Sequence, residues 1–187
     1  LKVSESHFIR SQKSYDSGDL ERAYDEAIEA WELMLLIESV NPYQATTQLA
    51  LAKIALTQVE RGDESFAIQA KDRYLQLAID FRGYPTLVGT AATAMASLGE
   101  YNEAIRLANR AIGTESTTKP WAKAWYAKGI SEYFLGDVSL GLKSLITATN
   151  KEPGSSTSKL AHKALSNIYE ERGDEENAQF HATRSAE

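Results

Sequence analysis

The chain has 187 residues, of which 43% are hydrophobic and 25% charged, which is the composition of a folded protein and excludes a wholly disordered one. It has no cysteine, which excludes disulfide frameworks, thiolate nucleophiles and Cys-ligated zinc. The formal net charge of −6 argues against a dedicated nucleic-acid binder. The longest apolar run, Leu33–Ile37, is too short to cross a membrane.

The pattern of apolar and small residues predicts an all-α chain of paired helices and no strand. In chain order the pairs are 4–17 with 19–38, 44–61 with 63–81, 85–98 with 100–113, 119–135 with 137–150, and 156–172 with 174–186. The second helix of the first pair is predicted to be about two turns longer than its counterparts. The connections are short and polar, so we predict one domain over 1–187, with repeats at about 4–40, 44–81, 85–115, 119–152 and 156–187.

A glycine followed by an acidic residue recurs between the two helices of each pair. The glycines are Gly18, Gly62, Gly99, Gly136 and Gly173; the last four are spaced by 37 residues and the first gap is 44. Glycine readily takes the left-handed conformation that ends a helix. The Asp or Glu that follows is suited to capping the next helix.

Small residues keep the same register on both sides of these glycines. Seven residues before each glycine stand Ser11, Ala55, Ala92, Gly129 and Ser166, and five residues after it stand Ala23, Ala67, Ala104, Gly141 and Ala178. We predict that these positions face each other where the paired helices approach closely. An alanine-rich bundle with accidental phasing would not keep this register along the whole chain.

The pattern resembles the tetratricopeptide repeat, a helix-turn-helix unit of about 34 residues. The fourth repeat matches best, with Trp125-Tyr126, Gly129, Tyr133, Gly136-Asp137, Gly141 and Pro153 at the family's positions. The likeness covers the chain in five repeats, each longer than the family's, and only Pro153 represents the closing proline. The resemblance implies an α-α superhelical solenoid whose first helices line a concave, partner-binding face.

Carried over repeat by repeat, the resemblance places one set of side chains in that face. The set that we expect to bind a partner is Phe8, Gln12, Tyr15, Leu56, Thr93, Tyr126, Ile130, Tyr133, Phe134, Lys163 and Asn167. Large apolar residues of the fourth repeat would anchor apolar side chains of a partner. The alternative is that these aromatic residues pack between neighbouring repeats. Lys163 with Asn167 resembles part of the family's carboxylate clamp, but no repeats follow to complete it, which disfavours a chaperone adaptor.

Enzymatic and metal-binding patterns are poorly supported. The three histidines, His7, His162 and His181, lack metal-ligand spacing, although the last two could share one repeat. No phosphate-binding glycine loop or nucleophile elbow is present. Acidic residues of the second predicted helix, namely Glu21, Asp25, Glu26, Glu29 and Glu32, have the spacing of a solvated face. The segment 119–163 is basic and contains aromatic residues, but these match repeat core positions, so we favour a solvated face or an acidic-peptide contact over nucleic acid.

The sequence therefore predicts a protein-interaction scaffold, not an enzyme, that binds a peptide or an amphipathic helix without a cofactor or metal. Its partners are expected to be proteins, neither nucleic acid nor membrane, with possible self-association through the solenoid ends. Two alternatives remain: an oligomerising assembly module, or a helper domain of a larger signalling protein (response-regulator-like) or secretion protein. A cytoplasmic location is expected, or a periplasmic one if a signal segment was removed.

Overall fold

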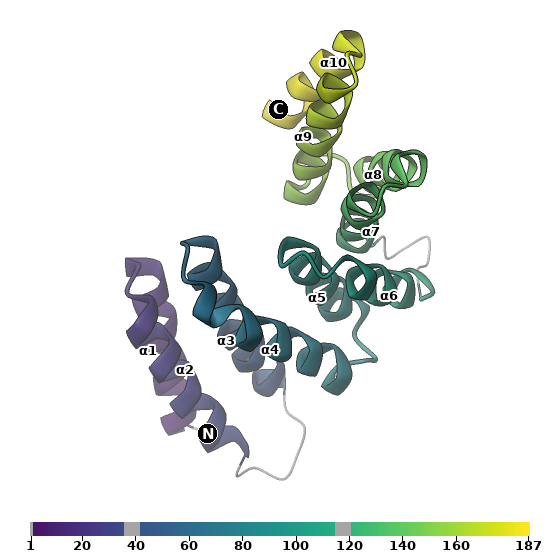
Figure 1. Ribbon diagram of the computed structural model, residues 1–187. Helices are drawn as coiled ribbons and strands as arrows, with labels where there is room; N and C mark the ends of the chain where they lie inside the picture. Colours follow the sequence, from purple (N-terminus) through teal and green to yellow (C-terminus); the bar gives the residue numbers. More distant parts are fainter. Residues whose placement is uncertain (1, 36–41, 115–120) are drawn as a thin grey trace. The chain divides into compact units, whose positions relative to one another are not determined.

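The computed structural model describes residues 2–35, 42–114 and 121–187, and all regular structure in these ranges is helical (Figure 1). Helices make up 85% of the described residues, which confirms the predicted all-α helical repeat. The helices are α1 (Lys2–Ser17), α2 (Leu20–Leu35), α3 (Pro42–Glu60), α4 (Ala67–Asp80), α5 (Pro85–Ser97), α6 (Tyr101–Ile112), α7 (Ala122–Phe134), α8 (Val138–Lys151), α9 (Ser156–Glu171) and α10 (Glu175–Ala186). They match the predicted pairs within a few residues.

One detail differs from the predicted helices, and another lies partly outside the described residues. The second repeat does not go directly into its second helix, because a 3₁₀ turn, Glu64–Phe66, comes before α4. The Asp63 side chain accepts a hydrogen bond from the Ser65 amide and so caps this turn. The long second helix of the first repeat is helical as far as Leu35. The rest of its predicted extension, 36–38, lies outside the described residues.

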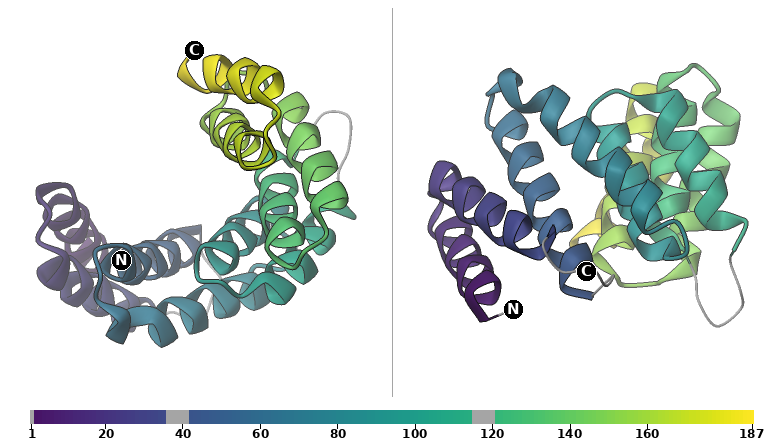
Figure 2. Two further views of the ribbon diagram at one scale, coloured as in Figure 1. Left: turned by 45° about the horizontal axis from the view of Figure 1, so that its top comes forward. Right: turned by 90° about the horizontal axis from the view of Figure 1, so that it is seen from below.

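The chain divides into two compact units, an N-terminal half (Leu1–Phe81) and a C-terminal half (Arg82–Glu187). In the N-terminal half α1 packs on α2, both contact α3, and α3 packs on α4. In the C-terminal half each pair of one repeat packs together, and the first helices α5, α7 and α9 also contact one another in turn (Figure 2). That all five repeats act as one continuous domain stays a prediction.

The glycine turns form as the sequence predicts. Each of the five repeat glycines has a positive φ, between 73° and 97°, which a residue with a Cβ rarely adopts. The amide after each glycine donates to a carbonyl five residues back, as Asp137 does to Glu132 at 2.9 Å. Side chains of Asp19, Asp137 and Asp174 also accept a hydrogen bond from the next helix's first turn, whereas Glu100 does not cap α6.

The small residues of the first, fourth and last repeats lie at the close approaches between paired helices, as expected. In the second repeat, where the 3₁₀ turn precedes α4, Ala67 is only half-buried and Ala70 is the buried residue. A Cβ on Gly129 would lie 2.9 Å from the Gly141 carbonyl oxygen, and one on Gly141 would lie 3.0 Å from that of Gly129. At the same position in the first and last repeats stand serines, which donate across the pair: Ser11 to the Ala23 carbonyl at 2.7 Å and Ser166 to that of Ala178 at 2.9 Å. The hydroxyl therefore adds a cross-helix hydrogen bond where the other repeats rely on contact alone.

Each half has its own apolar core. In the N-terminal half, Leu20, Ala23, Ala27, Leu51 and Ile54 form a buried cluster. In the C-terminal half, the cluster of Leu145, Ala148, Ala161, Leu165 and Ile168 joins α8 to α9; we call it the α8–α9 cluster. Burial of these side chains fixes the helices that carry the surfaces described below.

The acidic face predicted on α2 is solvated except at one residue. Glu21, Asp25, Glu29 and Glu32 are exposed or nearly so, but Glu26 turns toward α1. Its carboxylate accepts from Arg10 Nε at 2.9 Å and lies 2.7 Å from His7 Nδ1. The hydrogen bond from Arg10 is the main reason that the pKa of Glu26 is lowered.

Candidate functional site

The sequence-predicted residues of the C-terminal half gather on α7. Tyr126, Ile130 and Tyr133 stand at i, i+4 and i+7, so they share one face of this helix. All three are half-buried, and each packs partly against the α8–α9 cluster. Part of each side chain therefore remains open to a partner while the rest is held by the core. We call these three residues the α7 face.

Hydrogen bonding and burial hold the two tyrosines of the α7 face. The Tyr133 hydroxyl donates to the Glu171 carboxylate at the end of α9. This bond, with a smaller effect of burial, raises the pKa of Tyr133, and burial raises that of Tyr126. Both phenols are therefore neutral hydrogen-bond donors near neutral pH, and neither is suited to act as a base.

Phe134 lies mainly against another helix. Its ring stacks on that of Tyr101, at the start of α6, with centroids 5.0 Å apart, and 59% of the side chain is exposed. An edge contact with the Tyr133 ring, at 5.6 Å, links it to the α7 face. The structure thus brings Phe134 into contact with the predicted set, but its stacking partner Tyr101 was not anticipated from the sequence. Successive residues of a helix point in different directions, which explains why it reaches α6.

Small residues of α5 lie next to α7. A Cβ on Gly89 would lie 3.6 Å from the Ala124 amide nitrogen, which is ordinary contact. The Thr93 hydroxyl donates to the Gly89 carbonyl at 3.0 Å and lies 3.4 Å from that of Lys123. Thr93 therefore uses its hydroxyl inside the protein. Lys163 and Asn167, one turn apart on α9, are exposed.

The predicted residues of the N-terminal half lie on α1 and α3. Tyr15 joins the two helices, because its hydroxyl lies 3.1 Å from Thr57 Oγ1, and its ring packs on the core. Phe8 and Leu56 are half-buried, and Gln12 is exposed and bonded to Asp16. Gln12 and Tyr15 border a small groove of about 100 Å³. Lys53 also lines it, and the sequence reasoning missed this residue.

A larger hollow that the sequence reasoning missed lies at the N-terminal ends of α5 and α7. It has a volume of about 670 Å³, and its lining includes Tyr84, Leu87, Gly89 and Trp121. Tyr84 is 62% exposed. The signals in the sequence were Tyr84, in a connection that was treated only as a turn, and Trp121, which was placed inside the predicted helix 119–135.

Histidines are brought together in the last repeat but do not form a metal centre. His162 Nδ1 and His181 Nδ1 lie 2.7 Å apart, so one ring donates and the other accepts. Within the described ranges, no cluster of three or more His, Asp or Glu residues is arranged to hold a metal ion. In the same ranges, none of the helices has the length and apolar character that crossing a membrane would need.

Comparisons with known proteins identify the fold. No protein-family model matches the sequence, and no curated protein matches it. Among solved structures, MamA protein is 16% identical with a TM-score of 0.66, over 98% of this chain and 90% of that one. A tetratricopeptide repeat protein from Parabacteroides merdae is 18% identical with a TM-score of 0.65, over 99% and 66%. PilF of Pseudomonas aeruginosa is 12% identical with a TM-score of 0.69, over 99% and 76%. At these identities the likeness shows the fold alone, and it confirms the predicted tetratricopeptide-like repeat.

Proposed function

We propose that this chain, which has the tetratricopeptide-like fold, is a protein-interaction scaffold that holds a peptide or an amphipathic helix of a partner on its first helices. The fold supports this proposal in a general way, because stacked helix pairs hold a surface rigid before a partner arrives, so little entropy is lost by the protein on binding. The cytoplasmic location and the signalling role expected from the sequence stay predictions, as do the assembly and helper-domain alternatives.

The α7 face is the observation that carries the proposal. Large side chains at interface centres supply most of the binding energy when a partner covers them. Tyr126, Ile130 and Tyr133 are large, form one stripe, and are held from beneath by the α8–α9 cluster. Gly89 and Thr93 of α5 pack on Ala124 and Lys123 of α7, so the two helices lie close together beside this face. This combination fits the helix-in-groove mode of recognition.

The competing interpretation is that these side chains only complete the packing between repeats. Their partial contact with the α8–α9 cluster fits that interpretation as well. The two interpretations differ in what truncation does. A packing role predicts lost stability, whereas an anchor predicts lost affinity in a chain that stays folded.

The test uses a partner captured from the source cell and then titrated against variants of the chain. We expect Tyr126→Ala and Tyr133→Ala each to weaken binding about tenfold or more, because a buried anchor is worth about 2 kcal/mol or more. Tyr24→Ala is the matched control. Tyr24 is also a half-buried tyrosine that packs on a core cluster, but it lies on a second helix, α2, so its loss should leave affinity unchanged.

One outcome would contradict the proposal that the α7 face binds a partner. If the two α7 variants lose stability about as much as Tyr24→Ala does and still bind normally when folded, the α7 face is packing and the partner binds elsewhere.

A further inference from the structure

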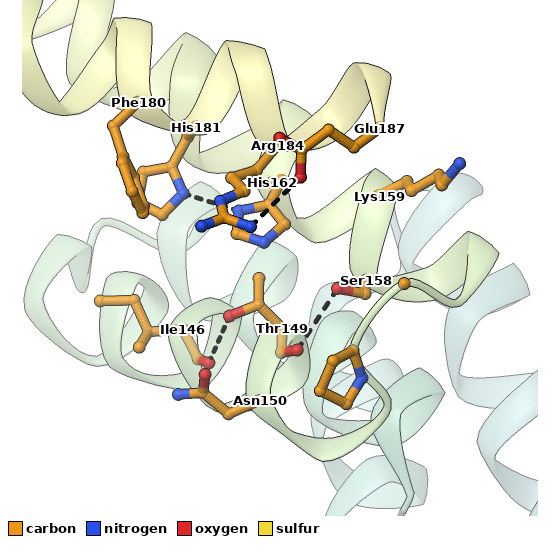
Figure 3. Close-up of a pocket in the computed structure, with 12 residues that line it drawn as sticks. Ile146, Thr149, Asn150, Ser158, Lys159, His162, Phe180, His181, Arg184 and Glu187 are labelled. Atoms are coloured by element: carbon orange, nitrogen blue, oxygen red, sulfur yellow. Dashed lines mark hydrogen bonds and ion pairs between the residues drawn. The ribbon is translucent and has the colours of Figure 1, made fainter.

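A pocket of about 380 Å³ opens in the last two repeats, between α8, α10 and the N-terminal part of α9 (Figure 3). Its walls include Ile146, Lys159, His162, Phe180, Arg184 and Glu187. None of these belongs to the residues proposed above to bind a partner, so the pocket is a separate site. Its volume is at the small end of the range for ligand pockets, about 300–1,000 Å³, so it fits one or two side chains and not a whole helix.

The permanent charges at this pocket favour an anion. Lys159 and Arg184 are the cations among its lining residues, and Glu187 is the one carboxylate among them. The Arg184 guanidinium lies over the Phe180 ring, 5.7 Å from its centroid, and this contact steadies it at the pocket. Among the described residues Lys159 has no ion-pair partner, and it lies at the rim, where it adds attraction for an incoming negative charge.

A carboxylate already occupies the position beside Arg184. Glu187 Oε2 accepts from Arg184 Nη1 at 3.1 Å, and Figure 3 shows this pair directly beside His162. The two side chains are 53% and 61% exposed, and an ion pair that is so open to solvent is worth little. A carboxylate from another chain can therefore replace Glu187 at small cost.

Apolar surface adjoins this charged position. Ile146 is 39% exposed and Phe180 53% exposed, and both line the pocket. An acidic residue next to an apolar one would therefore satisfy both parts of the pocket at once. Inorganic anions or a lipid headgroup would use only the charged part.

The two imidazoles at the pocket make binding at this site depend on pH. His162 and His181 are hydrogen-bonded through their Nδ1 atoms, which lie 2.7 Å apart. Burial is the main cause that lowers the pKa of both rings, and the positive charge of Arg184 lowers that of His162 further. The titratable and charged groups that face the pair are Arg184 and Glu187 from the end of α10 and Lys159 from α9 at the rim. The ring of Tyr169, also on α9, stacks on that of His181 with centroids 5.6 Å apart. A bound carboxylate favours the protonated pair, so binding should strengthen as the pH falls.

We propose that this pocket binds an acidic peptide segment of a partner protein, with an Asp or Glu carboxylate on Arg184 in place of Glu187 and a neighbouring apolar side chain against Ile146 and Phe180. The inference goes beyond the α7 face and does not depend on it, because the two surfaces share no residue.

The probe is a blocked six-residue peptide of alternating leucine and glutamate, and its reference is the same peptide with glutamine for glutamate. Binding to the whole chain is followed by amide chemical shifts of α8 and α10 in NMR titrations. We expect the acidic peptide to bind at least tenfold more tightly than the reference, and more tightly at pH 6 than at pH 7.5.

Three variants decide the outcome. Arg184→Gln should weaken binding at least fivefold, whereas Glu187→Gln, which removes the internal competitor, should tighten it two- to threefold. Lys143→Gln is the matched control, because Lys143 is an exposed lysine of α8 that does not line the pocket. It lowers the net charge by the same amount as Arg184→Gln and should leave binding unchanged.

Several results would overturn the proposal. These are no shift with the acidic peptide, equal binding of the glutamine reference, equal effects of Arg184→Gln and Lys143→Gln, or weaker binding by Glu187→Gln. Concentration-dependent self-association that Arg184→Gln abolishes, without peptide binding, would assign the pocket to a second copy of this chain instead.

Discussion

Gly129 is the position where the contact between two helices of one repeat can be tested most sharply. A Cβ at Gly129 of α7 would lie 2.7 Å from the Leu145 Cγ, 2.8 Å from the Leu145 amide nitrogen and 2.9 Å from the Gly141 carbonyl oxygen. Two of these atoms belong to the backbone of α8, so no change of rotamer relieves the clash. Replacing Gly129 by alanine must push α7 and α8 apart.

The size of the effect follows from two opposing contributions. Alanine inside a helix is more favourable than glycine by about 0.8–1 kcal/mol. Overpacking of a well-packed contact costs about 1–3 kcal/mol, and a clash with backbone belongs at the upper end of that range. We therefore expect Gly129→Ala to lower the free energy of unfolding by about 1–2 kcal/mol, the balance of these two contributions.

Gly89→Ala is the matched control. Gly89 is also a helix-interior glycine of the C-terminal half, but its Cβ would meet the Ala124 nitrogen and Cβ at 3.6 and 3.7 Å, which is ordinary contact. It gains the same helix propensity without the clash, so it should raise the free energy of unfolding by about 0.5–1 kcal/mol. The difference between the two variants then measures the overpacking alone.

The assay is urea denaturation followed by far-ultraviolet circular dichroism. When two variants have the same dependence of the unfolding free energy on urea concentration, a difference between their midpoints reports a difference in stability. Both substitutions lie in the C-terminal half, so they perturb the same compact unit. A Gly129→Ala variant that is as stable as Gly89→Ala would refute the close approach of α7 and α8. The predicted register of the small residues would then be wrong in this repeat.

Two further predictions concern stability. Because the pKa of both His162 and His181 is lowered in the folded chain, the unfolded chain binds more protons below its histidine pKa of about 6.5. The urea midpoint should therefore decrease as the pH is lowered from 7.5 to 5.5, and His162→Gln should make this decrease smaller. A midpoint independent of pH in this window contradicts the burial of the two rings. Asp137→Ala removes the side-chain cap on the Leu140 amide, 3.1 Å away, and should cost about 1 kcal/mol in the same denaturation assay, whereas Asp137→Asn, which keeps a capping oxygen, should cost less. Equal stability of both Asp137 variants and the unchanged chain would show that this cap contributes nothing.

The sequence by itself determined the helix pairs, their turns and the contacts within each pair. These features depend on residues close together in the chain. Each turn has a glycine in the left-handed conformation and a backbone hydrogen bond between residues only five positions apart, such as Asp137 and Glu132. Gly129 and Gly141 are 12 residues apart on two sides of one such turn, so once the turn is known their meeting follows from helix geometry.

Only the tertiary structure decided which side chains share a surface. The sequence reasoning added Phe134 to Tyr126, Ile130 and Tyr133 as one more aromatic residue of the same cluster, but its ring stacks on Tyr101 of the preceding repeat. The pocket at Arg184 likewise needs α8, α9 and α10 in their places, and no spacing in the sequence indicates that Glu187 lies beside a hydrogen-bonded histidine pair. Local sequence patterns determine the backbone dihedral angles and the helix lengths. The depth and lining of a pocket instead depend on how side chains of separate repeats fill the space between them, and no local pattern encodes that packing.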